Sequence, residues 1–266
     1  MAIQPVAWNV QREHMLIAIQ WACKKVYNSI DRLGMNRRSP TERLDDKIMG
    51  DIATIAILEY LHDLGIPALA YDYIRADQFK DPDPGWDVAI GADETEWKQF
   101  FKSPKNPAGL ITASVRSSRL PRNDTLNDAI RLRDFKIFTR PGKRIDECIT
   151  TDIEMQVYYN YGISQLGNRK IEDKHIVDCI KDYRRGEEII RRLDVDQRFG
   201  QCFLTAWNYK TAIVEHSSTL REPTWGSTHQ GYTKRMWHAP LRLGKSMKDL
   251  IELNKEVEEV RNFMPF

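Results

Sequence analysis

The chain has 266 residues, of which 41% are apolar, with 40 Lys+Arg against 38 Asp+Glu. This apolar content exceeds the level at which a chain stays disordered, and the balanced charge does not by itself mark a nucleic-acid binder. The longest apolar run, residues 52–61, is interrupted by Thr54 and Glu59. No segment approaches the roughly 20 apolar residues that span a bilayer, so we expect no membrane partner.

The N-terminus and the cysteines both predict a cytoplasmic protein. The first residues show no basic segment followed by an apolar one, and therefore no secretory signal. The four cysteines are scattered without a C-x-x-C pair, which favours reduced, buried thiols over a disulfide framework or a zinc site. They are Cys23, Cys148, Cys179 and Cys202.

Hydrophobic periodicity predicts an alternation of helices and strands. Apolar residues spaced three and four apart predict helices at 11–33, 42–64, 126–133, 172–193 and 246–263. Alternating or β-branched runs predict strands at 68–74, 86–91, 110–117, 134–139, 152–161 and 201–215. The polar stretch 93–106 reads as an insertion or hairpin tip, and the stretch 225–243 is rich in Trp and His.

These elements predict one α/β domain in three parts. Residues 1–41 form an N-terminal helical segment and residues 42–161 an α/β core. Residues 162–266 form an α+β extension packed on the same domain.

Acidic and basic residues recur at fixed places in the core. Asp51 lies on the helix at 42–64, and Asp87 starts a strand after the Pro-Gly-Trp turn. Ser114 and Arg116 lie two apart on the next strand, so their side chains share a face. Mg²⁺ prefers oxygen ligands and typically takes one or two carboxylates, with waters and phosphate oxygens completing its shell. A bound metal lowers the pKa of a water and neutralises charge on a phosphate.

This order resembles the PD-(D/E)XK nuclease family, which has the restriction-endonuclease-like fold. That family places an acid on a helix, an Asp after a turn at a strand start, and a Glu/Asp-x-Lys pair on the next strand. The resemblance covers roughly residues 42–140, with two residues inserted between Pro84 and Asp87.

The resemblance implies a central mixed sheet flanked by helices and a divalent-metal-dependent DNA endonuclease. Such an enzyme would belong to a type II restriction system or a related defence system. The metal, Mg²⁺ or Mn²⁺, would be held by Asp51 and Asp87. Arg116 would stabilise charge on the phosphate, with Ser114 as a weak or water-mediated ligand. A symmetric homodimer is also implied, because a two-fold protein matches a palindromic site.

The sequence departs from the family at its third element. Ser114 stands where the family has a carboxylate, and Arg116 stands in place of the lysine. Arginine holds a phosphate well but cannot accept a proton. An active variant would need another acid, for which Asp134 and Glu59 are candidates. Asp134-Phe135-Lys136 is also a rival for the Asp-x-Lys pair itself.

Two other functions remain open at this stage. A catalytically degenerate protein of this fold would bind nucleic acid as a specificity or assembly subunit. An α/β enzyme of unrelated chemistry would use the same acids only as structural residues.

Basic residues beyond the third motif predict contacts to a phosphate backbone. Arg119 and Arg122 follow the strand, and Lys234 and Arg235 lie among aromatic residues near the C-terminus. We expect them to bind DNA, with RNA left open as a partner. The alternative for each is a surface charge paired with a neighbouring acid.

Overall fold

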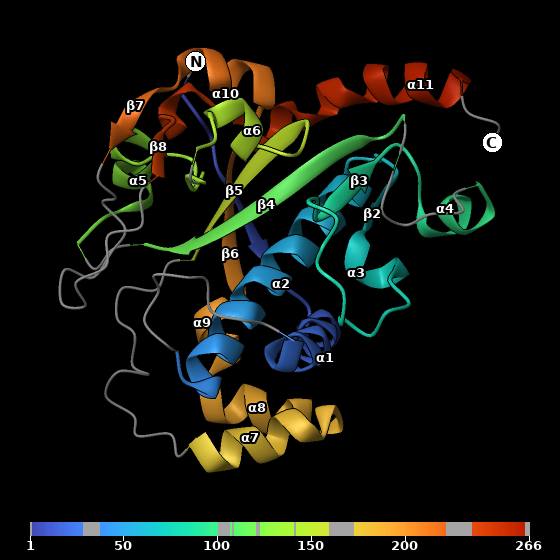
Figure 1. Ribbon diagram of the computed structural model, residues 1–266, viewed down its shortest axis with the longest axis vertical. Helices are drawn as coiled ribbons and strands as arrows, with labels where there is room; N and C mark the ends of the chain where they lie inside the picture. The colour runs from blue at the N-terminus through green and yellow to red at the C-terminus, as the bar shows by residue number, and fades with distance from the viewer. Residues whose placement is uncertain are drawn as a thin grey trace.

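A mixed, curled sheet with helices on both faces forms the protein, as Figure 1 shows. The computed structural model describes residues 2–28, 38–100, 107, 109–120, 123–140, 142–159, 173–221 and 236–263. The predicted α/β class with a mixed sheet is therefore confirmed. No helix in these ranges is long and apolar enough to cross a membrane.

The sheet takes strands from the whole length of the chain. Its members are β1 (Val6–Asn9), β2 (Ala68–Ala70), β3 (Val88–Ile90), β4 (Ile111–Arg119), β5 (Ile153–Tyr159), β6 (Gln201–Tyr209) and β9 (Lys245–Ser246). Their order is β1-β6-β5-β4-β3-β2, and β9 pairs with the far part of β6. The β4–β5 pair is parallel, and the other pairs in this sheet are antiparallel. The N-terminal segment and the C-terminal extension thus both contribute strands to the sheet of the core.

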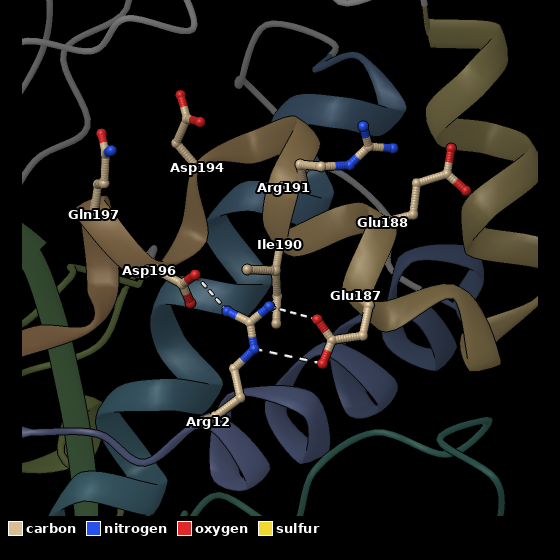
Figure 2. A pocket seen from close by; sticks show the side chains of 8 residues that line it. All are labelled: Arg12, Glu187, Glu188, Ile190, Arg191, Asp194, Asp196 and Gln197. Atoms are coloured by element: carbon tan, nitrogen blue, oxygen red, sulfur yellow. Dashed lines mark hydrogen bonds and ion pairs between the residues drawn. The ribbon is translucent and has the colours of Figure 1, made fainter.

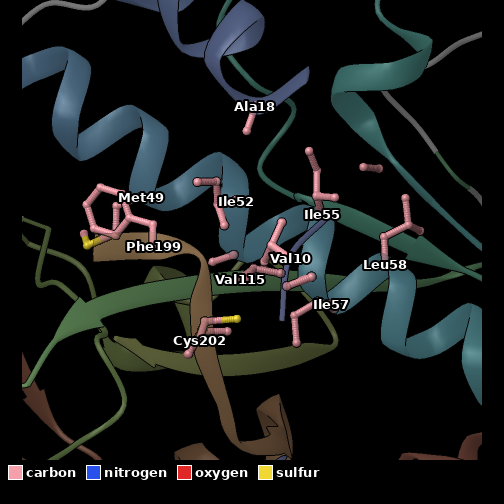
Figure 3. Close-up of a cluster of buried hydrophobic side chains, with 14 of the residues drawn as sticks. Val10, Ala18, Met49, Ile52, Ile55, Ile57, Leu58, Val115, Phe199 and Cys202 are labelled. Carbon is pink, nitrogen blue, oxygen red and sulfur yellow. The ribbon is translucent and has the colours of Figure 1, made fainter. Parts of the chain in front are cut away.

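One face of the sheet is covered by α1 (Arg12–Asn28) and α2 (Pro40–Asp63). Ser39 caps α2 through a reciprocal pair of hydrogen bonds with Glu42, and Pro40 occupies its first turn. The side of α2 that includes Ile52 and Ile55 packs with Val115 of β4 in the main core, which Figure 3 shows. Three further helices extend this layer: α7 (Asp173–Lys181), α8 (Gly186–Leu193) and α9 (Val195–Phe199).

The other face carries smaller elements around a second core. They are α5 (Leu126–Leu132), α6 (Ile145–Cys148), α10 (Lys210–His216), η4 (Leu241–Leu243), and the strand pair β7 (Ser218–Arg221) and β8 (Met236–His238). Phe135 and Ile137 enter this core beside Tyr158 of β5 and Ala206 of β6. Alternation along β4 therefore directs Val115 toward α2 and Arg116 toward this second layer.

Short helices complete the ends of the sheet. Two follow or flank β2 and β3, namely α3 (Tyr71–Ile74) and α4 (Glu94–Phe100). The remaining ones are η2 (Tyr183–Arg185) before α8, and η5 (Met247–Glu252) and α11 (Leu253–Phe263) at the C-terminal end. Trp97 of α4 packs against Trp86, with ring centroids 5.8 Å apart, in a small core that also contains Tyr71 of α3.

Several sequence predictions of local structure are wrong and have a physical reason. The predicted strand at 68–74 turns helical after Ala70, and the predicted strand at 201–215 turns helical after Tyr209. The stretch at 93–106 contains α4, which Asp93 and Glu96 cap through reciprocal hydrogen bonds. The predicted helix at 172–193 is interrupted at η2, and the predicted strand at 134–139 makes only two isolated bridges. In each case tertiary packing outweighs a weak local preference.

Candidate functional site

A polar row crosses the sheet on the face opposite α2. Asp87 precedes β3, and its backbone N–H donates to the oxygen of Ala113 at 2.9 Å, which sets Asp87 beside Ser114. Ser114 is in register with Glu154 of β5, and Glu154 with Asn208 of β6. Residues paired across strands share a face, so these four side chains lie in one line.

The carboxylate of Asp87 takes over a hydrogen bond that β3 would otherwise make. Its Oδ2 accepts from the backbone N–H of Val115 at 2.8 Å and from the hydroxyl of Ser114 at 3.0 Å. Burial raises the pKa of Asp87, and the charge of Arg116 and these two hydrogen bonds oppose the rise. Oδ1 accepts no hydrogen bond from the described residues and is the atom of this carboxylate that a ligand can use.

Arg116 and Glu154 form an ion pair next to this carboxylate. The Arg116 Nε donates to Glu154 Oε2 at 3.2 Å, and the Thr151 hydroxyl donates to Oε1 at 3.0 Å. Glu154 is 1% exposed, whereas the side chain of Arg116 is 34% exposed. Burial raises the pKa of Glu154, the charge of Asp87 adds to the rise, and Arg116 opposes it. The two acids are therefore close enough to repel each other across Ser114.

Among the described residues, no strand pairs with this edge of β4 beyond Ala113, and we call this part the open edge of β4. Pairing with β3 covers only Ile111–Ala113, while β4 continues to Arg119 with β5 on its other side. Lys136 reaches this edge, where its Nζ donates to the backbone oxygen of Ser117 at 3.0 Å. Burial lowers the pKa of Lys136 to about 8, and the charge of Asp46 opposes the shift. Three arginines reinforce it: Arg38, Arg116 and Arg119.

Asp51 lies in a separate cluster within the helical layer. Lys25 of α1 forms ion pairs with both Asp51 and Asp72, and Oδ2 of Asp51 is buried without a hydrogen bond. Burial raises the pKa of Asp51 to about 7, Lys25 opposes the rise, and Asp72 reinforces it. The two clusters interact through Lys25, whose charge also lowers the pKa of Asp87. The ammonium of Lys25, and not the carboxylate of Asp87, therefore lies against Asp51.

The acid beside Ser114 is neither of the two substitutes that the sequence suggested. Oδ1 of Asp134 accepts from Nδ1 of His238 at 2.7 Å, and Glu59 accepts from the indole N–H of Trp8 at 2.6 Å. Both are engaged with other elements. Glu154 was missed because its register with Ser114 depends on a crossover connection. Its only signal in the sequence is a predicted strand that carries two acids, at 152 and 154, on one face.

Of the predicted backbone-binding residues, only Arg119 lies in the described ranges. Arg119 forms ion pairs with Asp45 and Asp46 of α2, while its Nε is buried without a hydrogen bond. Asp45 is also held by both terminal nitrogens of Arg198 at 2.6 Å. The other three, Arg122, Lys234 and Arg235, lie outside the described residues.

The carboxylates of Asp87 and Glu154 are the candidates in the polar row for holding a divalent cation. Within the described ranges, no three His, Cys, Asp or Glu side chains gather in a metal-binding group. Two carboxylates are nevertheless enough for Mg²⁺, which completes its shell with waters and phosphate oxygens. Asp87 and Glu154 are such a pair, and a divalent cation between them would relieve both their burial and their mutual repulsion.

A surface depression between α1, α8 and α9 is distinct from this row. Figure 2 shows that Arg12 lies at its centre and is engaged by Glu187 and Asp196. Its lining contains none of the residues of the polar row. Arg12 is thus already paired with two acids of this lining.

Comparison with known proteins adds no family. No family model, no curated protein and no solved structure matches the chain. Function must therefore be inferred from the residues around β3, β4 and β5.

Proposed function

We propose that the protein is a divalent-metal-dependent DNA endonuclease with a restriction-endonuclease-like core, acting in a type II restriction system or a related defence system. The observation that carries the proposal is the polar row, in which Asp87 and Glu154 flank Ser114 beside Arg116 at the open edge of β4. The order of the elements supports it. A helix with Asp51 is followed by a strand preceded by Asp87, and then by a strand with Ser114 and Arg116.

The missing carboxylate of the motif is supplied from the next strand. Glu154 lies in register with Ser114, so a carboxylate from β5 stands beside position 114, where the family motif has its own acid. The hydroxyl of Ser114 donates to Oδ2 of Asp87 and fixes the orientation of that carboxylate. Ser114 is then a positioning residue for Asp87.

The chain's own groups suit phosphodiester hydrolysis. Asp87 Oδ1 and Glu154 would hold Mg²⁺ or Mn²⁺, which supplies an activated water and neutralises phosphate charge. Arg116 leaves most of its guanidinium donors available and is partly exposed, so it can bind an oxygen of the reacting phosphate. Arg116 stabilises negative charge in this scheme and does not act as the base.

A nucleic-acid-binding protein without cleavage is the second candidate. The observation that favours it is the Arg116–Glu154 ion pair, which occupies one of the two oxygens that a metal would use. A cation at this site must compete with the guanidinium for Glu154. A protein that never binds the metal would still bind DNA through its basic residues.

The test is cleavage of unmethylated plasmid DNA by the purified protein in Mg²⁺, Mn²⁺ and EDTA. We expect discrete, metal-dependent fragments that Asp87→Asn abolishes, because the amide keeps the hydrogen bond from Val115 but not the charge. Glu94→Gln, an exposed acid on α4, is the control and should cleave normally. DNA retarded on a gel but not cut in any metal would support the binding protein, and cleavage that survives Asp87→Asn would refute the assignment.

Measurement of the protein's mass in solution tests the predicted homodimer.

A further inference from the structure

Two side chains of opposite charge form hydrogen bonds with the backbone of β4 along its open edge. Asp87 accepts from the backbone N–H of Val115 at one end, and Lys136 donates to the oxygen of Ser117 at the other. Both side chains replace hydrogen bonds that a neighbouring strand would make. Because side chains and not a further strand make these hydrogen bonds, this edge of β4 leaves room for a ligand that a paired strand would exclude.

Lys136 is held at this edge by the packing of its neighbours. Phe135 and Ile137 are buried in the second core, so the side chain between them points the other way, toward β4. Its Nζ also lies 5.8 Å from the centre of the Phe138 ring. The packing of these two neighbours therefore fixes the position of the Lys136 ammonium.

The surroundings of Lys136 have an excess of cations. The charges that act on it are Asp46 and Arg38 at the start of α2, Arg116 and Arg119. The nearby acids are already shared, since Asp46 pairs with Arg38 and Arg119, and Asp45 with Arg119 and Arg198. Burying an ammonium among arginines is unfavourable unless an anion joins them.

Hydrogen-bond donors remain available at the same place. Among the described residues, the ammonium of Lys136 makes one hydrogen bond, and the guanidinium of Arg116 makes one, through Nε. The Nε of Arg119 is buried without a partner. These donors come from two elements that meet at one edge, and they match the acceptor oxygens of a phosphate.

We propose that Lys136 and Arg119 form a binding site for a backbone phosphate of DNA at the open edge of β4, next to the reacting phosphate that Arg116 would bind. The inference rests on the proposed function in naming DNA as the source of the phosphate. Along β4, the contact of Lys136 with Ser117 lies three residues beyond Ser114, which stands between Asp87 and Glu154. A DNA strand bound there runs along the edge with one phosphate at the acids and a neighbouring one at Lys136.

Binding of a short fluorescent DNA duplex in EDTA, measured by anisotropy over a range of salt concentrations, tests this site without cleavage. We expect Lys136→Gln to weaken binding about tenfold and to reduce the slope of log affinity against log salt by about one. Lys136→Arg should bind like the wild type at pH 7. Lys98→Gln, which replaces an exposed lysine on α4, is the control and should leave both the DNA affinity and the salt slope unchanged.

The pH dependence provides a second readout. Because the pKa of Lys136 lies at about 8, wild-type affinity should fall as the pH rises from 7 to 9.5. Lys136→Arg, whose side chain stays charged, should not show this fall. The other charged groups that face Lys136 are Asp46 and three arginines, Arg38, Arg116 and Arg119.

The outcomes for this site and for the nuclease are separable. Equal affinity and equal salt slope for wild type and Lys136→Gln would refute the phosphate site, whether or not the protein cleaves DNA. Binding that depends on Lys136, with no cleavage in any metal, would support the site and refute the nuclease. Absence of DNA binding by the wild type would refute the site directly.

Discussion

Replacing Lys136 with methionine should stabilise the protein at neutral pH. A pKa that falls from 10.5 in the unfolded chain to about 8 in the fold means that burying the charged amine costs about 3 kcal/mol at pH 7. Methionine has a similar length and no charge, but it loses the hydrogen bond to Ser117, worth about 1 kcal/mol. The net gain in the free energy of unfolding is about 2 kcal/mol.

The size of this effect decreases as the pH rises. Between pH 8 and 10.5 the unfolded chain binds a proton at Lys136 that the folded protein has lost, so the wild type becomes more stable as pH rises. The advantage of Lys136→Met should therefore shrink by about 2 kcal/mol between pH 7 and pH 9.5. Urea unfolding followed by circular dichroism at both pH values measures it, with Lys98→Met as the exposed control.

Two results would refute the reasoning. If Lys136→Met is less stable than the wild type at pH 7, the amine contributes more through its contacts than its burial costs. If the difference between the two proteins is the same at pH 7 and pH 9.5, Lys136 is not held among like charges. A stabilised variant that binds DNA poorly would instead show a functional site maintained at the expense of stability.

Three further substitutions test other parts of the structure. Asp51→Asn should gain stability relative to the wild type by about 2–3 kcal/mol from pH 5 to pH 8 in urea unfolding, because burial raises the pKa of Asp51 to about 7 and the folded protein has to ionise a carboxyl that the unfolded chain has already ionised. Lys25→Met should instead lose about 3–5 kcal/mol in the same assay, since it leaves two buried carboxylates facing each other. Glu154→Gln should reduce metal-dependent cleavage at least a hundredfold while Asp134→Asn cleaves normally, and equal activity of the two would remove Glu154 from the site. Gly85→Ala should cost about 1–3 kcal/mol in thermal or urea unfolding, because the backbone there has a φ of +103°, and an unchanged stability would contradict this strain.

The sequence predicted best those elements whose pattern is long and locally consistent. The helix of residues 42–64 is preceded by Pro40 and ends at Gly65 in the sequence, and it forms within two residues of the expected bounds, although its cap is Ser39 and not the expected Thr41. The strands around Ser114 and Glu154 also form where β-branched residues concentrate. Periodicity identifies such elements because burial follows the same period as the backbone.

The composition of the polar row could not be predicted in the same way. Ser114 and Glu154 are neighbours because β5 pairs in parallel with β4 after a crossover through α5 and α6, and the register of that pairing is not encoded locally. Lys136 was considered only as part of an Asp-x-Lys pair. Its contact with β4 depends on the packing of Phe135 and Ile137 against a second core built from distant segments.

The place of β6 in the sheet has a consequence for biosynthesis. β6 lies between β1, at one end of the strand order, and β5, and Val6 pairs with Leu204, so a strand from early in the chain pairs with one that comes almost 200 residues later. A nascent chain on the ribosome lacks the strand that joins β1 to β5 until residues 201–209 have emerged, and until then β1 and this side of β5 are unpaired. Folding should be slow and largely post-translational, and truncation before residue 201 should yield an aggregating fragment.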